Sequence, residues 1–569
     1  MPVFKSRHPD ISFPGDCTIW EWLFDEQSAY SPLNRFPRSD WAGYTDAATK
    51  EHLSWKGVKD AATHISTALR SQYGFQPNDT ISLFSRNTIW YETLAGHLSI
   101  RLSLSYPVTL FAAVRLGGVV SGASPAYNVE EMAYALKTAN SKYLATHPTS
   151  IKVAEQAARM AGIPRSHIFL LEGELEGYTT IQQLIQMGKS QGEHKQALAS
   201  KLPPGKKNGE VCAFLSFSSG TTGLPKAVMI SHQNAIAQAL QIEMLKPDDR
   251  PRKALGVLPL FHITGIVHSM ILPVFINAEV VMLPAFGMDS MLSAVVEYQV
   301  PELLLVPPIL IRLVRDPIVA KYDLSCVKRF SSGAAPLSAE IIQQLREKFP
   351  GTGFKQGYGM TESCSYDYAH TGGSIVASTQ VKLIKDDGTE AGIGEPGEIW
   401  ARGPQIVMGY LNNDKATRET FDEDGFLHTG DQGVIDNEGF VTITDRIKEM
   451  IKVNGIGVAP AELEDLLLGH VKVEDSAVLG IPDDWSGERP KAYVVLKKGI
   501  ARNESVGQEL IKYVEGSKVK HKWVKEIEFI DEIPKSASGK ILRRILRDKA
   551  NQGNQGTVVK ARGGPRARL

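Results

Sequence analysis

Nine consecutive residues at 218–226 are dense in hydrogen-bond donors, and their sequence is Ser-Ser-Gly-Thr-Thr-Gly-Leu-Pro-Lys. The two glycines, Gly220 and Gly223, let the backbone turn tightly and approach an anion closely. Backbone amides, four hydroxyls and one ammonium can contact phosphate oxygens; the side chains are Ser218, Ser219, Thr221, Thr222 and Lys226. A polar surface turn is the alternative, but so dense a run of donors favours a phosphate-binding loop.

Three other motif interpretations do not fit. The loop is not a Walker A motif, because Lys226 follows proline and precedes Ala227, so a P-loop ATPase or kinase is disfavoured. Residues 188–192 match GxSxG, but they follow an amphipathic helical stretch and not the buried strand that a hydrolase nucleophile needs. Residues 392–397 match GxGxxG, but they contain proline and lead into a strand, so we predict a tight turn.

Further motifs follow the loop in a fixed order along the chain. They are Ser-Gly-Ala-Ala-Pro at 332–336, Gly-Tyr-Gly-Met-Thr-Glu at 357–362, His-Thr-Gly-Asp at 428–431, Asp-Arg at 445–446 and Pro-Lys-Ser-Ala-Ser-Gly-Lys-Ile-Leu-Arg-Arg at 534–544. Together with the loop they resemble the adenylate-forming (AMP-binding) superfamily. The nearest resemblance is to its acyl-CoA synthetase branch, of the 4-coumarate–CoA ligase and fungal phenylacetate–CoA ligase types, from about Ile11 to Asp548.

The resemblance implies a site for ATP and the adenylate. Tyr358 would present a flat face to adenine, Thr361 would donate to the α-phosphate, and Glu362 would hold Mg²⁺ through its oxygens. Asp431 would accept the ribose hydroxyls, with Arg446 reaching the same sugar. Small residues in the 332–336 turn would let the backbone approach adenine. The remaining residues implied for this site are Gly333, Ala334, Ala335, Gln356, Gly357 and Gly359.

The C-terminal part supplies further implied roles. Lys540 is expected to bridge the attacking carboxylate and the α-phosphate, offsetting the charge that builds up in the transition state. Lys448 falls at the family's hinge, about which the C-terminal domain would rotate between two half-reactions. Lys452 and Gly455 correspond to positions on the path of coenzyme A, where a small residue leaves room for the thiol arm.

The acid itself is expected beside His262, in the stretch Leu-Pro-Leu-Phe-His-Ile-Thr-Gly at 258–265. We interpret His262 as lining the substrate pocket, with a hydrogen-bonded core histidine as the alternative. No base is required, because a carboxylic acid is already ionised at neutral pH. The pocket is expected from 263–270, 306–310, Gly333 and Gly357. These residues are uncharged, which favours an aryl or medium-chain acid.

The elements that position these residues follow an α/β pattern. Buried strands are expected at 81–85, 143–146, 168–171 and 213–217, and helices at 58–70, 129–138 and 335–349. We expect a large N-terminal domain of stacked mixed α/β sheets with a small β-barrel-like subdomain, and a small mobile α+β C-terminal domain. The predicted divisions are 1–446, 447–550 and a disordered tail at 551–569.

Composition sets further limits. The 569 residues exceed what one core can organise, so at least two domains are expected. With 63 basic and 63 acidic side chains the formal net charge is zero, so no nucleic-acid surface is expected. Polar residues interrupt the apolar region at 255–286, which predicts no membrane span. Four scattered cysteines, without a CxxC pair, argue against a zinc site and fit a reducing compartment.

Two local features concern the C-terminal tripeptide and a segment in the N-terminal domain. The C-terminal tripeptide Ala567-Arg568-Leu569 is a variant of the Ser-Lys-Leu peroxisomal address, so an import receptor and a peroxisomal location are expected, with the cytoplasm as the alternative. Residues Glu92–Ser105 interrupt the family pattern and are interpreted as an inserted surface loop or a translated intron.

The expected function is therefore an AMP-forming acyl- or aryl-CoA ligase that uses ATP, Mg²⁺ and coenzyme A. Two alternatives stay open. One is an adenylating enzyme that transfers its acyl group to a carrier protein or another acceptor, and the other is a non-catalytic adenylate-binding protein.

Overall fold

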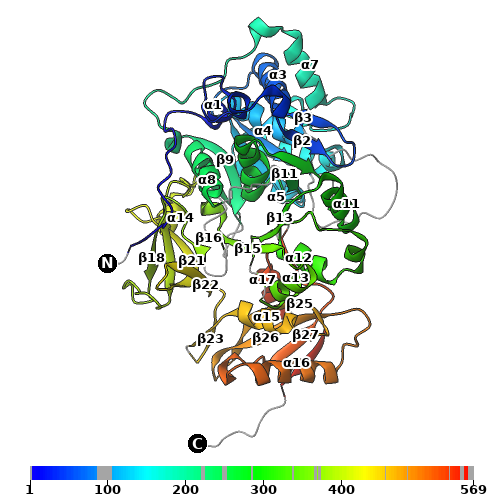
Figure 1. Cartoon of the computed structure of the whole chain (residues 1–569), viewed down its shortest axis with the longest axis vertical. Coiled ribbons are helices and arrows are strands. Elements are labelled where there is room, and N and C mark those ends of the chain that lie inside the picture. The colour runs from blue at the N-terminus through cyan, green and yellow to red at the C-terminus, as the bar shows by residue number, and fades with distance from the viewer. Residues whose placement is uncertain are drawn as a thin grey trace, which may run out of the picture.

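The computed structural model describes residues 3–85, 105–218, 225–245, 253–283, 286–335, 337, 339–363, 368–369, 373–454, 456–483, 485–536, 539–551 and 556–561. Most of the predicted insertion, residues 92–104, lies outside these ranges; its last residue, Ser105, opens helix α4 (Ser105–Arg115). In Figure 1 most of the strands and helices after residue 450 lie together at one end of the molecule's long axis.

The largest sheet has eight strands in the order β20-β10-β9-β5-β4-β6-β7-β8. Strands β4 to β9 pair in parallel, whereas β9–β10 and β10–β20 are antiparallel. The strands are β4 (Thr80–Phe84), β5 (Val119–Ala123), β6 (Ser141–Thr146), β7 (Ile168–Leu170), β8 (Thr179–Thr180), β9 (Cys212–Ser218), β10 (Lys226–Ser231) and β20 (Gly409–Tyr410). All four predicted strands are therefore present within one or two residues.

Helices connect and accompany these strands, and they begin at residues that can cap them. Helix α3 (Trp55–Tyr73) starts after Ser54, whose hydroxyl accepts from Gly57 N–H, and ends at Gly74 with φ of 68°. These two end signals extend the helix beyond the predicted 58–70. Helix α5 (Val129–Thr138) follows a reciprocal Asn128–Glu131 cap and matches its prediction. The others are α1 (Ile19–Phe24), α6 (Ile151–Ala161), α7 (Ile181–Ser190) and α8 (His232–Met244).

The expectation that residues 188–192 follow the helical stretch is wrong for 188–190, which belong to helix α7 (Ile181–Ser190), where Gly188 is buried. Gly188 lies inside α7, so the GxSxG match is not a nucleophile turn. Gly394, with φ of 79°, lies in a turn that leads directly into strand β19 (Gly397–Arg402).

Two further sheets have four strands each. One is β11-β12-β2-β3 and the other β13-β14-β15-β16. Their strands are β11 (Lys253–Gly256), β12 (Glu279–Met282), β2 (Gly43–Asp46), β3 (His52–Ser54), β13 (Glu302–Leu305), β14 (Arg329–Ser332), β15 (Gly353–Tyr358) and β16 (Tyr368–Ala369). Their helices include α9 (Ile263–Gly265), the π-helical turn η6 (Ile266–Ile271), α10 (Leu272–Ile276), α11 (Met288–Tyr298), α12 (Pro307–Arg315) and α13 (Ala339–Lys348).

The predicted start of a helix at Ala335 is wrong by four residues, because α13 begins at Ala339. Ala334 adopts a φ of 71°, a left-handed conformation that cannot belong to a right-handed helix. The chain therefore makes a turn after β14 before the helix starts.

A six-stranded antiparallel sheet, in the order β1-β18-β19-β21-β22-β17, corresponds to the expected barrel-like subdomain. Besides β19, its strands are β1 (Phe4–Lys5), β18 (Gln380–Ile384), β21 (Leu427–Ile435), β22 (Phe440–Arg446) and β17 (Gly373–Ser374). Helix α14 (Asp414–Thr420) lies between β20 and β21 in the chain.

The last sheet runs β24-β23-β26-β27-β28, with β25 on the other edge of β26, and all its strands come after residue 450. These are β23 (Ile451–Val453), β24 (Ile456–Val458), β25 (Val473–Asp483), β26 (Gly487–Leu496), β27 (Glu526–Phe529) and β28 (Thr557–Lys560). Helices α15 (Pro460–Leu468), α16 (Glu504–Ser517) and α17 (Arg543–Asn551) accompany them. An α+β unit is thus present where the small C-terminal domain was expected.

The prediction of a disordered tail over 551–569 is wrong for β28. Residues 557–560 pair antiparallel with β27, and Val559 is buried against Gly507 of α16. The Thr-Val-Val segment is β-branched, and this local preference outweighs the polar composition around it.

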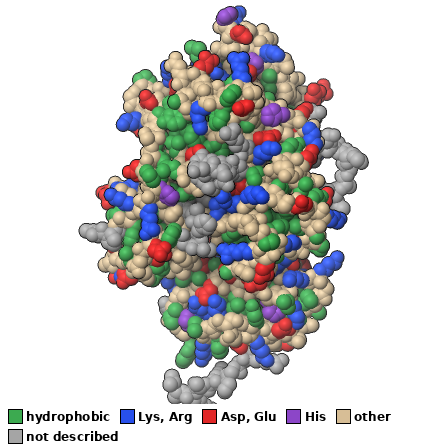
Figure 2. All heavy atoms as spheres, in the orientation of Figure 1, with side chains coloured by type: hydrophobic (Ala, Val, Ile, Leu, Met, Phe, Trp, Pro, Cys, Tyr) green, Lys and Arg blue, Asp and Glu red, His purple; other side chains and the backbone are tan. Residues whose placement is uncertain are grey.

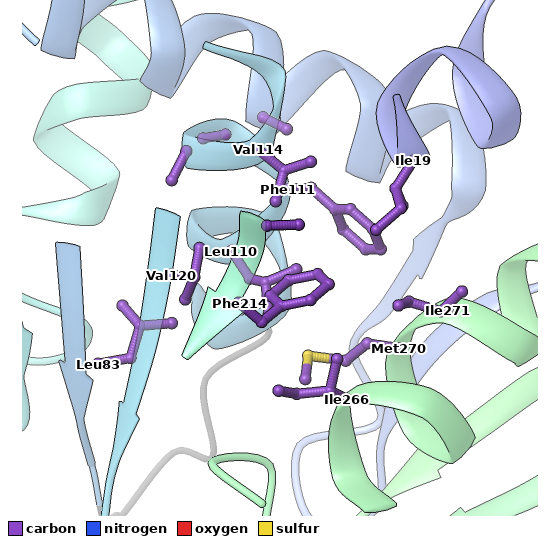
Figure 3. Packing of buried hydrophobic residues seen from close by; sticks show 14 of the residues in the cluster. Ile19, Leu83, Leu110, Phe111, Val114, Val120, Phe214, Ile266, Met270 and Ile271 are labelled. Carbon is purple, nitrogen blue, oxygen red and sulfur yellow. The ribbon is translucent and has the colours of Figure 1, made fainter. Parts of the chain in front are cut away.

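The largest hydrophobic core lies between the large sheet and the helices around it (Figure 3). Phe214 of β9 packs there among side chains from α1, α4, β5 and η6, which the figure labels as Ile19, Leu110, Phe111, Val114, Val120, Ile266, Met270 and Ile271. Each such buried side chain contributes about 1.5–3 kcal/mol. The core therefore fixes β9, and with it the place where Ser218 leaves the sheet.

Charged side chains of both signs are interspersed over the face shown in Figure 2, as the zero net charge predicts. Within the described residues no helix combines the length and the apolar character that crossing a bilayer requires.

Candidate active site

The predicted phosphate loop joins two adjacent antiparallel strands. Ser218 ends β9, Lys226 begins β10, and these two residues are paired across the strands. The loop residues Ser219, Gly220, Thr221, Thr222 and Gly223 lie outside the described residues. The loop is anchored at its far end, where the Tyr134 hydroxyl donates to Pro225 O at 3.1 Å.

Lys226 is connected to Glu362 through a tyrosine. The Lys226 ammonium lies 4.4 Å from the centre of the Tyr410 ring, and the Tyr410 hydroxyl donates to Glu362 Oε1 at 2.9 Å. Both Tyr410 and Glu362 are buried. The arrangement orients one carboxylate oxygen of Glu362 and stabilises the lysine charge over the ring face.

The segment after β15 carries the second predicted motif. Gln356, Gly357 and Tyr358 end the strand, Gly359 follows, and Thr361 and Glu362 lie in a short 3-10 turn (Thr361–Ser363). The Ser363 hydroxyl accepts from Met360 N–H at 3.1 Å, which holds the turn. Thr361 is buried beside Glu362.

Tyr358, Asp431 and Arg446 come together from three strands. The Tyr358 hydroxyl donates to Asp431 Oδ2 at 2.6 Å, and Arg446 Nε lies 3.5 Å from Asp431 Oδ1. Asp431 and Arg446 are register partners on β21 and β22. Burial raises the pKa of Asp431, while the charge of Arg446 and the Tyr358 hydroxyl oppose that rise.

The predicted adenine turn lies at the end of β14. Ser332 closes the strand and is fully buried, and Gly333, Ala334 and Ala335 follow. A φ of 71° at Ala334 costs on the order of 1–3 kcal/mol for a residue with a Cβ. Gly333 follows the last residue of β14, and Gly357 lies on β15 one residue after Gln356, the register partner of Ser332.

The C-terminal loop is folded back on itself before it presents Lys540. Ser536 N–H donates to Lys540 O at 2.8 Å, and the Ser536 hydroxyl accepts from Lys540 N–H at 3.2 Å. Gly539 has a φ of 82°, and a Cβ at this position would lie 3.1 Å from Pro308 Cδ of α12. The loop therefore lies directly against the N-terminal part of the chain.

Charged residues from both parts of the chain act on the Lys540 ammonium. Burial first, and then the charge of Arg446, lowers the pKa of Lys540 to about 8, whereas Glu449, Asp431 and Glu362 act in the opposite direction. The structure thus brings Lys540 to the same electrostatic environment as Asp431 and Glu362, although 109 positions separate Lys540 from Asp431 in the sequence.

The predicted hinge residue, Lys448, is exposed in a turn directly after β22. Glu449 N–H and Met450 N–H both donate to Arg446 O, at 2.9 and 3.0 Å. The same segment is tied to the C-terminal loop, because Arg543 Nη1 lies 2.7 Å from Glu449 Oε2. Arg543 Nη2 also contacts Glu464 of α15 at 2.6 Å.

The two residues expected on the coenzyme A path follow the turn that contains Lys448. Lys452 is exposed on β23, and its N–H donates to Glu488 Oε2 at 2.7 Å. Gly455 lies outside the described residues.

His262 is half-buried and caps α9. Its Nδ1 accepts from Thr264 N–H at 3.3 Å, which leaves the proton of the neutral ring on Nε2. Burial lowers the pKa of His262 to about 4, so the ring is neutral at physiological pH. His262 can therefore offer one N–H donor but no positive charge. Gly122 of β5 permits its approach, since a Cβ there would lie 2.3 Å from Phe261 O.

Tyr410 and Arg543 belong to this arrangement but were not among the predicted site residues. Tyr410 reaches Glu362 because the two-residue strand β20 pairs with β10, a contact between distant segments that has no signal in the local sequence. Arg543 lies within the motif at 534–544, but nothing in that motif shows which carboxylates it meets.

Comparison with known proteins decides the family. The family model described as AMP-binding enzyme matches residues 33–411, and that described as AMP-binding enzyme C-terminal domain matches residues 462–540. The chain belongs to the AMP-binding enzyme family.

Individual members are similar over nearly the whole length of this AMP-binding enzyme. A probable CoA ligase of Humulus lupulus is 34% identical, covering 96% of this chain and 95% of its own. 4-coumarate–CoA ligase 5 of Oryza sativa subsp. japonica is 32% identical, with 97% and 98% covered. Peroxisomal OPC-8:0-CoA ligase 1 of Arabidopsis thaliana is 33% identical, with 88% and 89% covered.

Among solved structures, the anthranilate CoA ligase AuaEII in complex with anthranoyl-AMP superimposes with a TM-score of 0.82. It is 23% identical, and 95% of this chain and 98% of that chain are covered. This likeness concerns the fold, and it agrees with the predicted two-part α/β architecture.

Proposed function

We propose that this AMP-binding enzyme ligates a carboxylic acid to coenzyme A in two steps driven by ATP. In the first step a carboxylate oxygen attacks the α-phosphorus, and pyrophosphate leaves. In the second step the thiol sulfur of coenzyme A attacks the acyl carbon, the thiol proton is lost, and AMP leaves. The enzyme is an AMP-forming acid–thiol ligase.

The observation that carries the proposal is the meeting of Lys540 with Asp431 and Glu362. Three separate motifs contribute one charged side chain each: Asp431 and Glu362 are buried, Lys540 is half-buried, and the two carboxylates raise the pKa of Lys540 against the effect of burial. A phosphate-binding turn would not need a lysine delivered from the other end of the chain. A reaction that creates negative charge at one phosphorus does need it.

The roles that follow are part of the proposal. Ser218, Lys226 and the loop between them hold the β- and γ-phosphates, and Tyr358, Asp431 and Arg446 hold the nucleoside. Thr361 and Lys540 contact the α-phosphate, with Lys540 neutralising charge in the transition state. Neutral His262 positions the acid through its Nε2–H. Catalysis then rests on positioning and electrostatics.

Glu362 fits a magnesium ion bound together with nucleotide. Mg²⁺ in such sites takes one or two protein carboxylates and completes its shell with phosphates and water. Glu362 offers one buried carboxylate whose orientation Tyr410 fixes. When bound, the ion would neutralise phosphate charge. No group of three or more potential metal-ligating side chains occurs among the described residues.

For the second step we propose that the C-terminal part pivots at Lys448 and that Lys452 and Gly455 border the thiol arm of coenzyme A. The similarity to named CoA ligases supports coenzyme A as the acceptor in preference to a carrier protein. The presence of Lys540, Glu362 and the loop ends in one site supports catalysis in preference to adenylate binding alone.

The test is product identity with purified enzyme, ATP, Mg²⁺ and a panel of aryl and medium-chain acids. We expect AMP and pyrophosphate in equal amounts, and an acyl-CoA of the corresponding mass only when coenzyme A is present. ADP and phosphate as products, or AMP formation without any acyl-CoA, would contradict the proposal.

We also propose import into peroxisomes when Ala567-Arg568-Leu569 ends the chain. The tripeptide lies outside the described residues, and the support is its sequence together with the similarity to the peroxisomal ligase of Arabidopsis thaliana. A fluorescent protein fused ahead of the chain should accumulate in peroxisomes, and removal of Leu569 should leave it in the cytoplasm. Equal distributions of the two fusions would contradict this location.

A further inference from the structure

Helix α15 begins without a cap from its own sequence. The residue before it is Ala459, which has no side-chain acceptor, and Pro460 opens the first turn. Glu462 in that turn is engaged elsewhere, since its carboxylate contacts Lys518 at 2.8 Å and Lys522 at 2.6 Å. The N–H groups of a first helical turn have no partner within the helix. An acceptor for α15 can therefore come only from another segment or from water.

Asp445 supplies this acceptor from the end of strand β22. Its Oδ2 accepts from Ala461 N–H at 3.2 Å, and its Oδ1 accepts from Arg446 N–H at 2.7 Å. A side-chain cap usually comes from the residue directly before the helix, as Asn503 caps α16 by accepting from Val506 N–H at 3.0 Å. Asp445 instead lies 16 positions before Ala461, so the chain between them includes the predicted hinge.

The Asp445 carboxylate and the start of α15 stabilise each other. Burial raises the pKa of Asp445, and the charge of Glu449 adds to the rise. The N–H groups of Arg446 and Ala461 and the charge of Arg543 act in the opposite direction. A negative charge is also favourable at the positive end of the helix dipole. Separation of Asp445 from α15 would therefore cost both partners a favourable contact.

Asp445 and α15 lie on different sides of Lys448 in the chain. Asp445 is the register partner of Gln432 on β21. Ile447 N–H still donates to Gly430 O of the same strand at 2.9 Å. These contacts hold Asp445 to the six-stranded sheet up to the residue before Lys448. A pivot at Lys448 would leave Asp445 in place and carry α15 away from it.

Beyond the predicted hinge the chain is bound to the C-terminal part. Glu449 Oε2 lies 2.7 Å from Arg543 Nη1, and Arg543 Nη2 lies 2.6 Å from Glu464 of α15. Glu464 is buried, and its Oε1 also accepts from Val478 N–H of β25 at 2.7 Å. These contacts connect α15, β25 and the C-terminal loop. Lys540 lies three residues before Arg543, so the position of α15 helps to set that of Lys540.

We propose that Asp445 is a positioning residue for adenylate formation, which caps α15 only while the C-terminal part is docked with Lys540 at the site. The cap favours this arrangement over the one reached by rotation, in which Ala461 N–H loses its carboxylate acceptor. Asp445 takes no part in the chemistry. The inference rests on the proposed function and adds a residue that holds its first step in place.

The test compares the two half-reactions in the full-length Asp445→Ala variant. Adenylation is measured as single-turnover pyrophosphate release from ATP and the best acid of the panel, without coenzyme A. Thioester formation is measured as acyl-CoA produced from the prepared acyl-adenylate and coenzyme A. We expect the ratio of the first rate to the second to fall about fivefold to tenfold, as for the loss of a helix cap.

ATP binding separates this effect from a disturbance of the neighbouring Arg446. In the proposed function Arg446 holds the nucleoside in both steps, so its displacement would weaken ATP binding and slow both half-reactions. We expect the ATP affinity of Asp445→Ala, measured by calorimetry, to stay near that of the wild type. Asp445→Asn keeps an acceptor oxygen without the charge. Its ratio should fall by about twofold to threefold, the share due to charge at a helix terminus.

Asn503→Ala is the matched control. It removes the cap of α16 in the same C-terminal part, but Asn503 directly precedes its helix and no hinge lies between them. This variant should melt at a lower temperature than the wild type and keep the wild-type ratio of the two half-reactions. Thermal melting of all three variants shows whether they are folded.

The outcomes separate the inference from the proposed function. If neither half-reaction occurs with any acid, the proposed function fails and the inference falls with it. If both occur and folded Asp445→Ala keeps the wild-type ratio, the inference alone is overturned. Where Asp445→Ala does not fold, an unchanged ratio in Asp445→Asn overturns it. An equal fall of the ratio in Asn503→Ala would also overturn it, because any weakening of the C-terminal part would then suffice.

Discussion

Lys540 is the residue whose protonation governs the first step in this account. Its pKa is lowered to about 8, chiefly by burial, so the ammonium predominates below pH 8 and is lost as the pH rises above it. We expect kcat/KM for acid-dependent pyrophosphate release to fall as the pH rises through about 8. A pH profile at limiting ATP measures this, since kcat/KM reports the free enzyme.

Lys540→Arg provides the control for that profile. A guanidinium stays charged throughout this range, so the residual activity of the variant should lose the alkaline fall. A wild-type profile that stays flat to about pH 10 would disagree with the shift assigned to Lys540.

Tyr410→Phe tests the link between the phosphate loop and Glu362. The change removes the 2.9 Å hydrogen bond to Glu362 Oε1 but keeps the ring beneath Lys226. We expect kcat/KM for pyrophosphate release to fall about tenfold, because a lost hydrogen bond to a buried carboxylate costs about 1.5–3 kcal/mol. Tyr322→Phe, which removes a surface hydroxyl bonded to Asp289, should leave the rate unchanged.

For single residues, the sequence predicts the site roles of those that lie in ordered motifs, such as Asp431, Arg446 and Lys540. It does not predict Tyr410, whose contact depends on the pairing of distant strands. Nor does it predict the ion pair between Glu302 and Lys355, because strand register brings these two side chains to one face of the sheet.

Among the elements, β26 carries a buried cation between two acidic partners on β27. Lys491 Nζ lies 2.7 Å from Glu526 Oε1 and 2.8 Å from Glu528 Oε2, and its side chain is 2% exposed. Burial alone would lower the pKa of Lys491, but the hydrogen bonds that its ammonium donates to the two glutamates raise it overall. The pairing of these strands therefore depends on charge as well as on apolar packing.

Lys491→Met should destabilise the C-terminal part by about 3–5 kcal/mol, because it leaves two buried carboxylates without this cation. The measurement is the unfolding of the full chain, followed calorimetrically for a transition lost or shifted from this part. Adding Glu526→Gln and Glu528→Gln should recover much of the loss. Equal stability of Lys491→Met and wild type would show that the triad contributes little.

Element types follow from hydrophobic periodicity, and α5 matches its prediction residue by residue. Boundaries fail where a special conformation or a long-range pairing intervenes. Helix α13 begins at Ala339, four residues after its predicted start, and Ala334 in the turn before it has a left-handed φ. Pairing with β27 orders residues 557–560 within a tail of polar composition.

For the whole molecule, the central feature is how the C-terminal part docks onto the rest. Arg315 of α12 donates to Leu468 O at 3.0 Å and to Glu474 O at 2.8 Å. Leu468 is the last residue of α15, where a cation is favoured by the helix dipole. This contact supports the arrangement in which Gly539 meets Pro308 and Lys540 reaches the site.

Arg315→Ala should weaken this docking and slow adenylation by about tenfold, since a hydrogen bond from a charged group contributes about 1.5–3 kcal/mol. Thioester formation from a supplied acyl-adenylate should be unaffected, because the proposed rotation at Lys448 breaks the contact. The two half-reactions are measured separately. Arg312→Ala is the control, as Arg312 pairs with Asp316 on its own side of the interface.

Neither the docked arrangement nor the Arg315 contact can be predicted from the sequence, because both depend on how two distant parts of the chain meet. The division at residue 446 and the hinge at Lys448 stay predictions that the half-reaction measurements address.

The most direct test of the account is acid-dependent exchange of pyrophosphate into ATP by Lys540→Ala, measured beside the wild-type enzyme. The account predicts that exchange falls by orders of magnitude while ATP binding, measured by calorimetry, is retained. Unchanged exchange in Lys540→Ala would contradict the claim that the two parts of the chain meet to form one adenylation site.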